Sequence, residues 1–348
     1  MTSKVNYISG WDIGGAHIKV ARCNSDGELT QVIQVPCPLW LGIDQLEKAI
    51  ESIFSLLNNQ HDLMAITMTG ELVDIFPNRQ AGVAGILSCL SSYLEPEKLI
   101  IYGAESGWLT PEEATQQWSQ VASRNWQASA SIVAHNCKHG LFIDIGSTTC
   151  DIIPFSKETA QPQGVDDFQR QTSRELLYTG VIRTPLIALC QTAPFDGALV
   201  SLAAELFATT GDVWCLLNQL ESSSIQDSSA DGQSWDTHAC ASRIARLLGS
   251  DFDQASLNQW RQLAQWFAEQ QVHQITQAIL QVQSLHSEWP DDAPLIGAGV
   301  GRFIVKICAH RLNRPYLDFA STLSTSNIDA SDHAPAVAVA LLAYQNLP

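Results

Sequence analysis

The chain has 348 residues, a formal net charge of −17 and a hydrophobic fraction of 45%. That fraction is enough for a sizeable core, so a disordered chain is excluded. The shortage of Lys and Arg argues against nucleic-acid binding, because neutralising phosphates needs clustered cations. The length predicts two compact lobes or one large α/β unit.

Cellular context is indicated by three features. No apolar run approaches the ~20 residues of a membrane-spanning helix, and the longest run lies at 334–344. The N-terminus lacks the apolar segment of a signal peptide. The nine cysteines form no CxxC pair, which predicts reduced thiols packed as small hydrophobes. We therefore expect a soluble, cytoplasmic protein with no membrane partner.

The first 120 residues predict three strands followed by alternating helices and strands. The strands of the opening meander are separated by glycine-containing turns, as in antiparallel hairpins. Thr110, Pro111 and Glu113 form a strong helix start, with Thr as N-cap and Glu at N3. In chain order the expected elements are strands 5–13, 17–23 and 29–35, helix 43–57, strand 63–67, helix 79–94, strand 98–102 and a helix from 111.

The opening pattern returns near residue 140. Residues 141–153 echo residues 8–20, because each segment reads as strand, Asp-Ile-Gly, small polar turn, strand. Such internal similarity predicts two related lobes, lobe I at 1–137 and lobe II at 138–348. This division leaves room for the C-terminal helix to pack back on lobe I.

The rest of lobe II predicts one loop and several helices. The polar stretch 221–236 is rich in Ser, Asp and Gly, so we expect a mobile loop that covers the site when substrate binds. Apolar residues recur at helical spacing through the Gln-rich region 257–282, which we interpret as core. A strand runs into a glycine turn at 294–301, and helices follow at 303–311 and 334–347.

Three glycine-bearing turns predict phosphate binding. Glycine allows backbone N–H groups to approach a phosphate closely, and a nest of such groups binds anions without cationic side chains. An Asp at the end of the preceding strand holds Mg²⁺ directly or through water, which makes Asp12 and Asp144 the candidate metal ligands. A glycine turn before a helix places an anion at its positive N-terminus. The candidate phosphate contacts are Gly14, Gly15, Gly146, Ser147, Thr148, Thr149, Gly297, Gly299 and Gly301.

Four further side chains are candidates, each with a plainer structural alternative. Lys19 and Arg183 are candidate anion contacts, although either is also explained as a surface cation or an ion-pair partner. Asp74 is a candidate cleft carboxylate or general base, and His17 a candidate base or phosphate donor; a turn cap and a solvated hairpin residue are the alternatives. The His-x-Cys-x-His segment at 135–139 has no second ligand pair at suitable spacing, so no metal site is predicted there.

These motifs resemble the actin-like ATPase superfamily, which includes sugar kinases, Hsp70-type chaperones and the hydantoinase/oxoprolinase group. Its first phosphate motif matches 12–19, its second 144–151 and its adenosine motif 295–301. The resemblance implies an α/β fold of two ribonuclease-H-like lobes, each with a mixed sheet, around a phosphate-binding cleft.

A narrower resemblance is to a tetrahydromethanopterin-linked one-carbon-pathway family, which is similar to a methanofuran-biosynthesis synthase. The matching segments are 11–19, 68–74, 142–151 and 178–185. This resemblance implies a transferase in which the phenol oxygen of a tyramine- or tyrosine-type acceptor displaces diphosphate from an aminomethylfuranylmethyl diphosphate. Mg²⁺ and the backbone turns would stabilise the departing diphosphate.

Two other functions stay open at this point. The chain fits an ATP-dependent small-molecule kinase that uses 297–301 for adenosine, and it fits a non-catalytic ATP-binding regulatory protein. The sequence decides neither ATP or ADP binding nor the acceptor tail, and a homodimer is left open. Tight ATP binding with turnover would indicate a kinase, and diphosphate binding without ATP binding would indicate the transferase.

Overall fold

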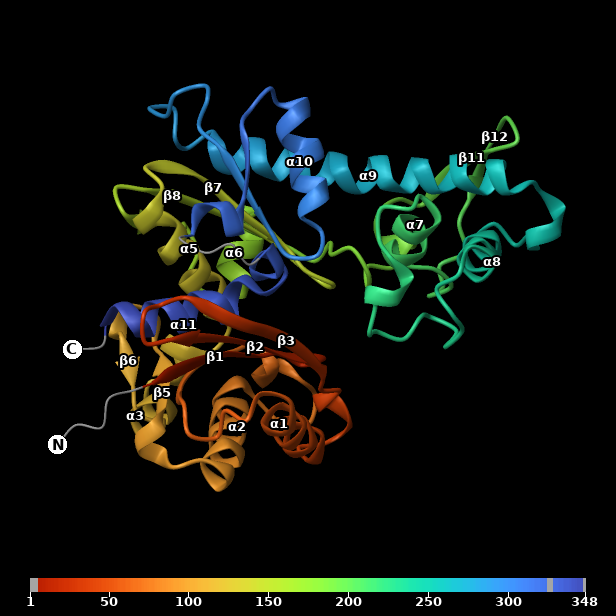
Figure 1. Ribbon diagram of the computed structural model, residues 1–348. Coiled ribbons are helices and arrows are strands. Elements are labelled where there is room, and N and C mark those ends of the chain that lie inside the picture. Colours follow the sequence, from red (N-terminus) through yellow and green to blue (C-terminus); the bar gives the residue numbers. More distant parts are fainter. Residues whose placement is uncertain (1–5, 324–327, 347–348) are drawn as a thin grey trace. The chain divides into compact units, whose positions relative to one another are not determined.

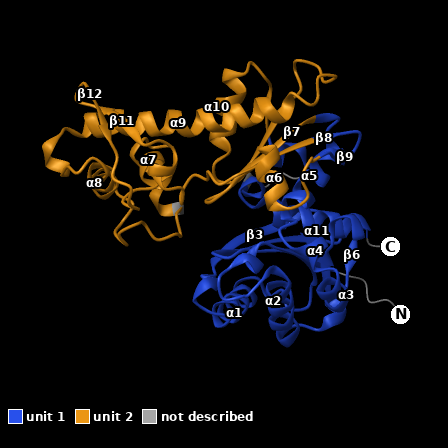
Figure 2. Ribbon diagram, turned by 180° about the vertical axis from the view of Figure 1, so that it is seen from behind, with its two compact units in different colours: residues 1–139, 155–161, 318–348 blue, residues 140–154, 162–317 orange. Residues whose placement is uncertain are grey.

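The computed structural model describes residues 6–323 and 328–346; its elements are labelled in Figure 1. The chain divides into two compact units (Figure 2): unit 1 holds 1–139, 155–161 and 318–348, and unit 2 holds 140–154 and 162–317. The prediction placed 155–161 and 318–348 in lobe II and left room for the C-terminal helix to pack back on lobe I; in the structure both segments belong to unit 1. The reason is packing, because the first contacts helix α5 (Asn125–Asn136) and the second contains helix α11 (Ala334–Asn346), which packs on the unit 1 sheet.

Unit 1 is built on a six-stranded mixed sheet with the order β3-β2-β1-β4-β5-β6. The pairs β1–β2 and β2–β3 are antiparallel, whereas β1–β4 and β4–β5 are parallel. This order is that of a ribonuclease-H-like lobe, as the resemblance implied. The strands are β1 (Tyr7–Ile13), β2 (His17–Asn24), β3 (Leu29–Pro36), β4 (Leu63–Met68), β5 (Leu99–Tyr102) and β6 (Trp108–Leu109).

Helices cover both faces of the unit 1 sheet (Figure 1). Helices α1 (Asp44–Leu57) and α2 (Arg79–Tyr93) share a core with one face, and α11 packs on β1, β2 and β4 from the other. Gly10 permits this close approach, because an added Cβ would lie 2.1 Å from the Ala336 carbonyl oxygen. Helix α3 (Pro111–Gln116) begins at the predicted capping box of Thr110 and Glu113, and α4 (Trp118–Val121) follows it.

Unit 2 repeats the same strand order in a second mixed sheet, β10-β8-β7-β13-β14. A hairpin of β7 and β8 opens it, and β13 pairs parallel with β7 as β4 does with β1. The predicted fold of two mixed α/β lobes is therefore confirmed. The strands are β7 (His139–Ile145), β8 (Cys150–Ser156), β10 (Leu176–Leu177), β13 (Leu295–Ala298) and β14 (Tyr316–Asp318), and β9 (Thr159–Ala160) pairs with the far end of β8.

Helices α7 (Thr210–Leu216), α8 (Thr237–Leu247) and α10 (Arg302–Arg311) of unit 2 pack against one long helix, α9 (Leu257–Gln283) (Figure 1). Its apolar stripe, with Trp260, Phe267 and Ile275, is buried, which confirms the interpretation of this region as core. The remaining elements are α6 (Asp167–Ser173), β11 (Thr192–Phe195) and β12 (Ala198–Ser201).

The nine cysteines are free thiols, and seven of them are buried. Across residues 6–323 and 328–346, no helix combines the length and the apolar character that a bilayer crossing requires.

Candidate functional site

The turn between β1 and β2 carries the first group of predicted residues. Asp12 lies opposite Lys19 in the antiparallel register, so both side chains are on the same face of the sheet. Asp12 is 6% exposed, whereas Lys19 and His17 are half-buried. The Gly14 N–H donates to the His17 carbonyl at 3.0 Å and closes the turn. The structure thus brings a buried carboxylate and a lysine together at a glycine turn.

The end of β4 lies against this turn. The Thr69 N–H donates to the Ile13 carbonyl at 2.9 Å. A Cβ on Gly70 would come within 3.2 Å of two carbonyl oxygens at the start of the turn, and one on Gly15 would come within 2.8 Å of Val73 Cγ1. The glycines are therefore required by the space between the two strand ends.

Two polar side chains adjoin Asp12. The Asn125 amide donates to Asp12 Oδ1 at 3.5 Å, which is a long hydrogen bond. Thr67 lies opposite Asp12 in the parallel register, and its buried hydroxyl has no hydrogen-bond partner among the residues that the structure describes. A buried hydroxyl is normally bonded, so this position offers one unused polar group next to the carboxylate.

Asp74, the predicted cleft carboxylate, is exposed on the turn after residues 70–72. Three residues earlier, Glu71 is 1% exposed and accepts a hydrogen bond from Ser123 Oγ at 2.7 Å. Helix α2 packs directly over it, since a Cβ on Gly82 would lie 2.4 Å from the Glu71 carbonyl oxygen. Sequence reasoning missed Glu71, because nothing in the spacing of this short segment separates a buried carboxylate from an exposed one.

The β7–β8 hairpin of unit 2 repeats the geometry of the first hairpin. Asp144 is half-buried, one residue before the end of β7, where Asp12 lies in β1. The Gly146 N–H donates to the Thr149 carbonyl at 3.0 Å, as Gly14 does to His17. The Ser147 and Thr148 hydroxyls lie 3.5 Å apart within this turn.

The third glycine turn packs against the second hairpin. Gly299 has a φ of +77°, and a Cβ there would lie 2.4 Å from Asp144 Oδ1 and 2.3 Å from the Ile145 carbonyl oxygen. The Gly301 N–H donates to the same carbonyl at 2.8 Å, and Gly301 is the N-cap of α10. Gly297 lies in β13 against the ring of Tyr316. Two of the three predicted turns therefore meet at the Asp144 carboxylate.

A third segment, residues 179–184, completes this part of unit 2. The Val181 N–H donates to the Gly146 carbonyl at 3.0 Å, and the N–H groups of Ile182 and Arg183 donate to the Ser147 carbonyl at 3.1 and 2.9 Å. The backbone of Arg183 is thus part of the site. Its side chain is 42% exposed, with Nε 3.9 Å from Asp227 Oδ1.

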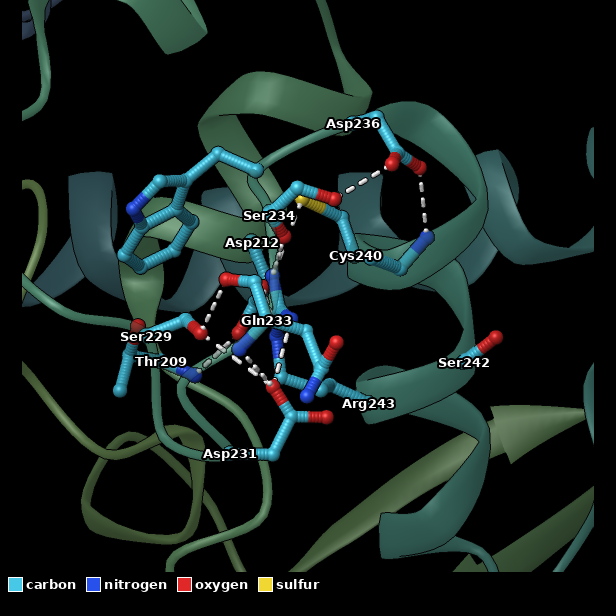
Figure 3. A network of polar contacts seen from close by, with 12 residues as sticks. Thr209, Asp212, Ser229, Asp231, Gln233, Ser234, Asp236, Cys240, Ser242 and Arg243 are labelled. Atoms are coloured by element: carbon cyan, nitrogen blue, oxygen red, sulfur yellow. Dashed lines mark hydrogen bonds and ion pairs between the residues drawn. The ribbon is translucent and has the colours of Figure 1, made fainter.

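A buried arginine anchors the polar stretch 221–236 (Figure 3). Arg243 of α8 is fully buried and donates to Asp212 Oδ1 at 2.7 Å, to Asp231 Oδ1 at 2.9 Å and to the Ser234 carbonyl at 3.0 Å. Two residues of the stretch, Asp231 and Ser234, are thus bound by the buried guanidinium of Arg243. The expectation of a mobile lid did not include this anchor, because Arg243 lies outside the polar stretch.

The two carboxylates on Arg243 have opposite pKa shifts. Burial raises the pKa of Asp212 to about 6, although Arg243 acts in the other direction. Partial burial acts to raise the pKa of Asp231, but hydrogen bonds and charges from the Gln233 N–H, Arg246 and Arg243 outweigh it and lower this pKa to about 2. Both carboxylates are therefore ionised at neutral pH.

A second charged pair lies beside the second hairpin. Arg170 of α6 is 1% exposed and donates to Asp151 Oδ1 at 2.7 Å and to the Glu175 carbonyl at 3.1 Å. Burial raises the pKa of Asp151, and Arg170 opposes that shift. The sequence did not reveal this pair, because α6 and β8 are separated by a loop with no recognisable spacing. Within the described ranges, no group of three or more His, Cys, Asp or Glu side chains is arranged to hold a metal ion, and this includes 135–139.

The repeated strand order and the glycine turns define an actin-like ATPase fold. The hydantoinase/oxoprolinase family model matches residues 62–345. The chain belongs to the hydantoinase/oxoprolinase family.

Particular relatives narrow the family further. A protein of Methanocaldococcus jannaschii, named "(4-{4-[2-(gamma-L-glutamylamino)ethyl]phenoxymethyl}furan-2-yl)methanamine synthase", is 31% identical over 245 residues, which are 70% of this chain and 72% of that protein. A Methanococcus vannielii protein of the same name is 34% identical over 131 residues, 37% of this chain and 59% of that protein. Both relatives are named as synthases, so this is a family of enzymes.

A solved structure has a similar fold over most of the chain. The nucleotide-free structure of acetone carboxylase superposes with a TM-score of 0.52 at 8% identity, over 85% of this chain and 66% of that chain. A likeness at this identity shows the fold.

Proposed function

We propose that this protein is a transferase of methanofuran or methylofuran synthesis. It joins an aminomethylfuranylmethyl diphosphate to the phenol oxygen of a tyramine- or tyrosine-type acceptor and releases diphosphate. The observation that carries the proposal is the product named for the M. jannaschii relative, a phenoxymethyl furan that bears a methanamine. That product is an aryl ether, and its two halves are the two substrates proposed here.

The reaction balances as a displacement at one carbon. The phenol oxygen forms a bond to the furanylmethyl carbon, the bond from that carbon to the diphosphate oxygen breaks, and the phenol proton passes to a base. The furan stabilises positive charge at this carbon, so the main demand on the protein is to bind the departing diphosphate. A free phenol has a pKa of about 10, so a base is also useful; Asp74 and His17 are our candidates.

The unit 2 turns suit a diphosphate. Backbone N–H groups and three hydroxyl side chains gather at residues 146–149, beside the Asp144 carboxylate and the start of α10. In unit 1, Lys19 and the glycines at 14 and 15 are the corresponding candidate contacts.

Mg²⁺ fits the carboxylates of the two hairpins. It usually takes one or two carboxylates plus phosphate oxygens and water, and Asp12 and Asp144 each supply one carboxylate in their own unit. The unused Thr67 hydroxyl beside Asp12 is consistent with a further polar ligand there. When bound, Mg²⁺ would neutralise charge on the diphosphate.

The test is synthesis of the ether without ATP. Purified protein with Mg²⁺, the aminomethylfuran diphosphate and tyramine should release diphosphate and yield an ether of the expected mass. The O-methyl ether of tyramine, which lacks the phenol proton, should give no product. If product appears only with ATP, or if a phosphorylated acceptor forms, the protein is a kinase. ATP binding without any turnover would indicate a regulatory protein.

A further inference from the structure

The second glycine turn, residues 146–149, is in close contact with the backbone of Gly180. A Cβ on Gly180 would lie 2.4 Å from the carbonyl carbon and oxygen of Ser147 and 2.4 Å from the nitrogen of Thr148. Gly180 therefore packs over the plane of the Ser147–Thr148 peptide. Gly180 cannot move toward this peptide without displacing it.

The loop after Gly180 also fixes the direction of the N–H groups in the turn. The carbonyls of Gly146 and Ser147 accept from the backbone of residues 181–183. In a trans peptide the N–H points opposite to the C=O, so the N–H groups of Ser147 and Thr148 point away from this loop. Two successive N–H groups with the same direction are suited to an anion.

Three buried side chains hold Gly180 itself. Its carbonyl accepts from Gln271 Nε2 and from Thr210 Oγ1, both at 2.8 Å, and from Thr184 Oγ1 at 3.2 Å. Its N–H donates to Thr184 Oγ1 at 2.9 Å. All three side chains are at most 4% exposed. Buried polar groups that are fully bonded in this way are rigid.

Gln271 is the centre of this cluster. It lies in the middle of α9 and is fully buried, although most glutamines of that helix are solvent-accessible. Its Oε1 accepts from Trp214 Nε1 at 2.7 Å, which fixes the orientation of the amide, and its Nε2 also donates to Thr179 Oγ1 at 3.1 Å. Every polar atom of the amide is therefore used.

We infer that Gln271 is a positioning residue for anion binding: through the Gly180 carbonyl it holds the turn at residues 146–148 with the N–H groups of Ser147 and Thr148 directed at a diphosphate. Thr210 acts on the same carbonyl. This inference rests on the proposed function for the identity of the anion. Gln271 itself contacts no anion, since its amide is committed to Trp214, Thr179 and Gly180.

The experiment measures the affinity for inorganic diphosphate in the presence of Mg²⁺ by calorimetry. Gln271→Met and Thr210→Val each remove one donor to the Gly180 carbonyl, and each should weaken binding about tenfold, the equivalent of one lost hydrogen bond. The double variant should fall short of a hundredfold, because both side chains act on one group. In the ether-forming assay, the KM for the furan diphosphate should rise while that for the phenol stays unchanged.

Gln274→Met is the matched control. Gln274 lies one turn further along α9 and donates to the Leu189 carbonyl at 3.1 Å, so the same substitution there breaks the same kind of bond away from Gly180. It should leave diphosphate affinity within twofold of the unmodified protein. If Gln271→Met does not fold, Thr210→Val decides the outcome, because it keeps the Gln271 amide in place.

The outcomes separate this inference from the reaction. Folded variants that bind diphosphate as tightly as the unmodified protein overturn the positioning role, and ether synthesis is then judged separately. If the expected affinities are found but no ether forms, the proposed reaction fails and the positioning role stands. An unmodified protein that does not bind diphosphate overturns both.

Discussion

Removing Arg243 should leave the buried negative charge of Asp212 without a counter-ion. Asp212 has no exposed surface, and its carboxylate also accepts the Thr209 N–H at 2.9 Å at the start of α7. Arg243→Met keeps the length of the side chain and removes its charge. Losing one partner of a buried ion pair costs about 3–5 kcal/mol.

The assay is urea unfolding at pH 7.5, followed by tryptophan fluorescence. With an m-value of ~2 kcal/mol per molar urea, that cost lowers the unfolding midpoint of Arg243→Met by roughly 1.5–2.5 M. Asp212→Asn in the Arg243→Met background removes the unpaired charge and keeps an oxygen for the α7 cap. The double variant should therefore recover more than 1 kcal/mol, about the low end of one buried-group penalty.

The pH dependence supplies an independent check with a defined sign. The folded pKa of Asp212, about 6, lies above its unfolded value of about 3.9, so the folded state binds this proton more tightly. Stability from this group is complete below the unfolded pKa and is lost as pH rises through 6. Relative to Asp212→Asn, the unmodified protein should lose about 2 kcal/mol between pH 4.5 and 7.5.

Asp231 is the control, because its shift has the opposite sign. Its folded pKa of about 2 means that its contribution is lost only as pH falls below the unfolded value. The difference between the unmodified protein and Asp231→Asn should thus stay nearly constant from pH 7.5 to 4.5. An Arg243→Met midpoint within 0.5 M of the unmodified protein, roughly 1 kcal/mol at that m-value, would refute the assignment of Asp212 as a charge neutralised by Arg243.

Two further predictions concern the hairpin carboxylates and the polar stretch 221–236. Asp12→Asn and Asp144→Asn should each lower turnover about 100-fold or more at saturating Mg²⁺ with unchanged circular dichroism, whereas Asp253→Asn, an exposed carboxylate of unit 2, should not; full activity in both site variants would contradict the site. A broad-specificity protease should leave 221–236 intact in the unmodified protein and cut it early in Arg243→Met, and equal cutting in the two would show that the arginine does not anchor this stretch.

The features that sequence predicted are local. The capping box at Thr110 and the two Asp-Ile-Gly hairpins depend on residues within a few positions of one another, so their spacing is visible in the chain. The similarity of residues 141–153 to residues 8–20 also predicted that the chain contains two sheets of similar topology. The close approach of Gly299 to the Asp144 carboxylate was not predicted from the sequence.

The features that sequence did not predict depend on contacts between distant residues. Gln271 is one of many glutamines in a Gln-rich helix, and only its burial against residues 179–180, some 91 positions away, distinguishes it. Arg243 likewise looks like an ordinary helical cation until its three acceptors are seen. Composition alone indicated a mobile loop at 221–236 and did not show that Asp231 and the Ser234 carbonyl of this stretch bind Arg243.

The two hairpins differ in the residue that lies opposite their first aspartate, Asp12 in unit 1 and Asp144 in unit 2. Gly14 and Gly146 form equivalent hydrogen bonds across their turns, to His17 and Thr149. Lys19 lies opposite Asp12 in the first hairpin, and the same register places Asp151 opposite Asp144 in the second. Unit 1 therefore places a cation opposite its carboxylate. Unit 2 places a second carboxylate there and cancels it with a buried arginine from α6. The chain has a net charge of −17, so an uncompensated Asp151 would repel an anion at the second hairpin. Because Arg170 neutralises Asp151, the backbone N–H groups of the turn can bind an anion there.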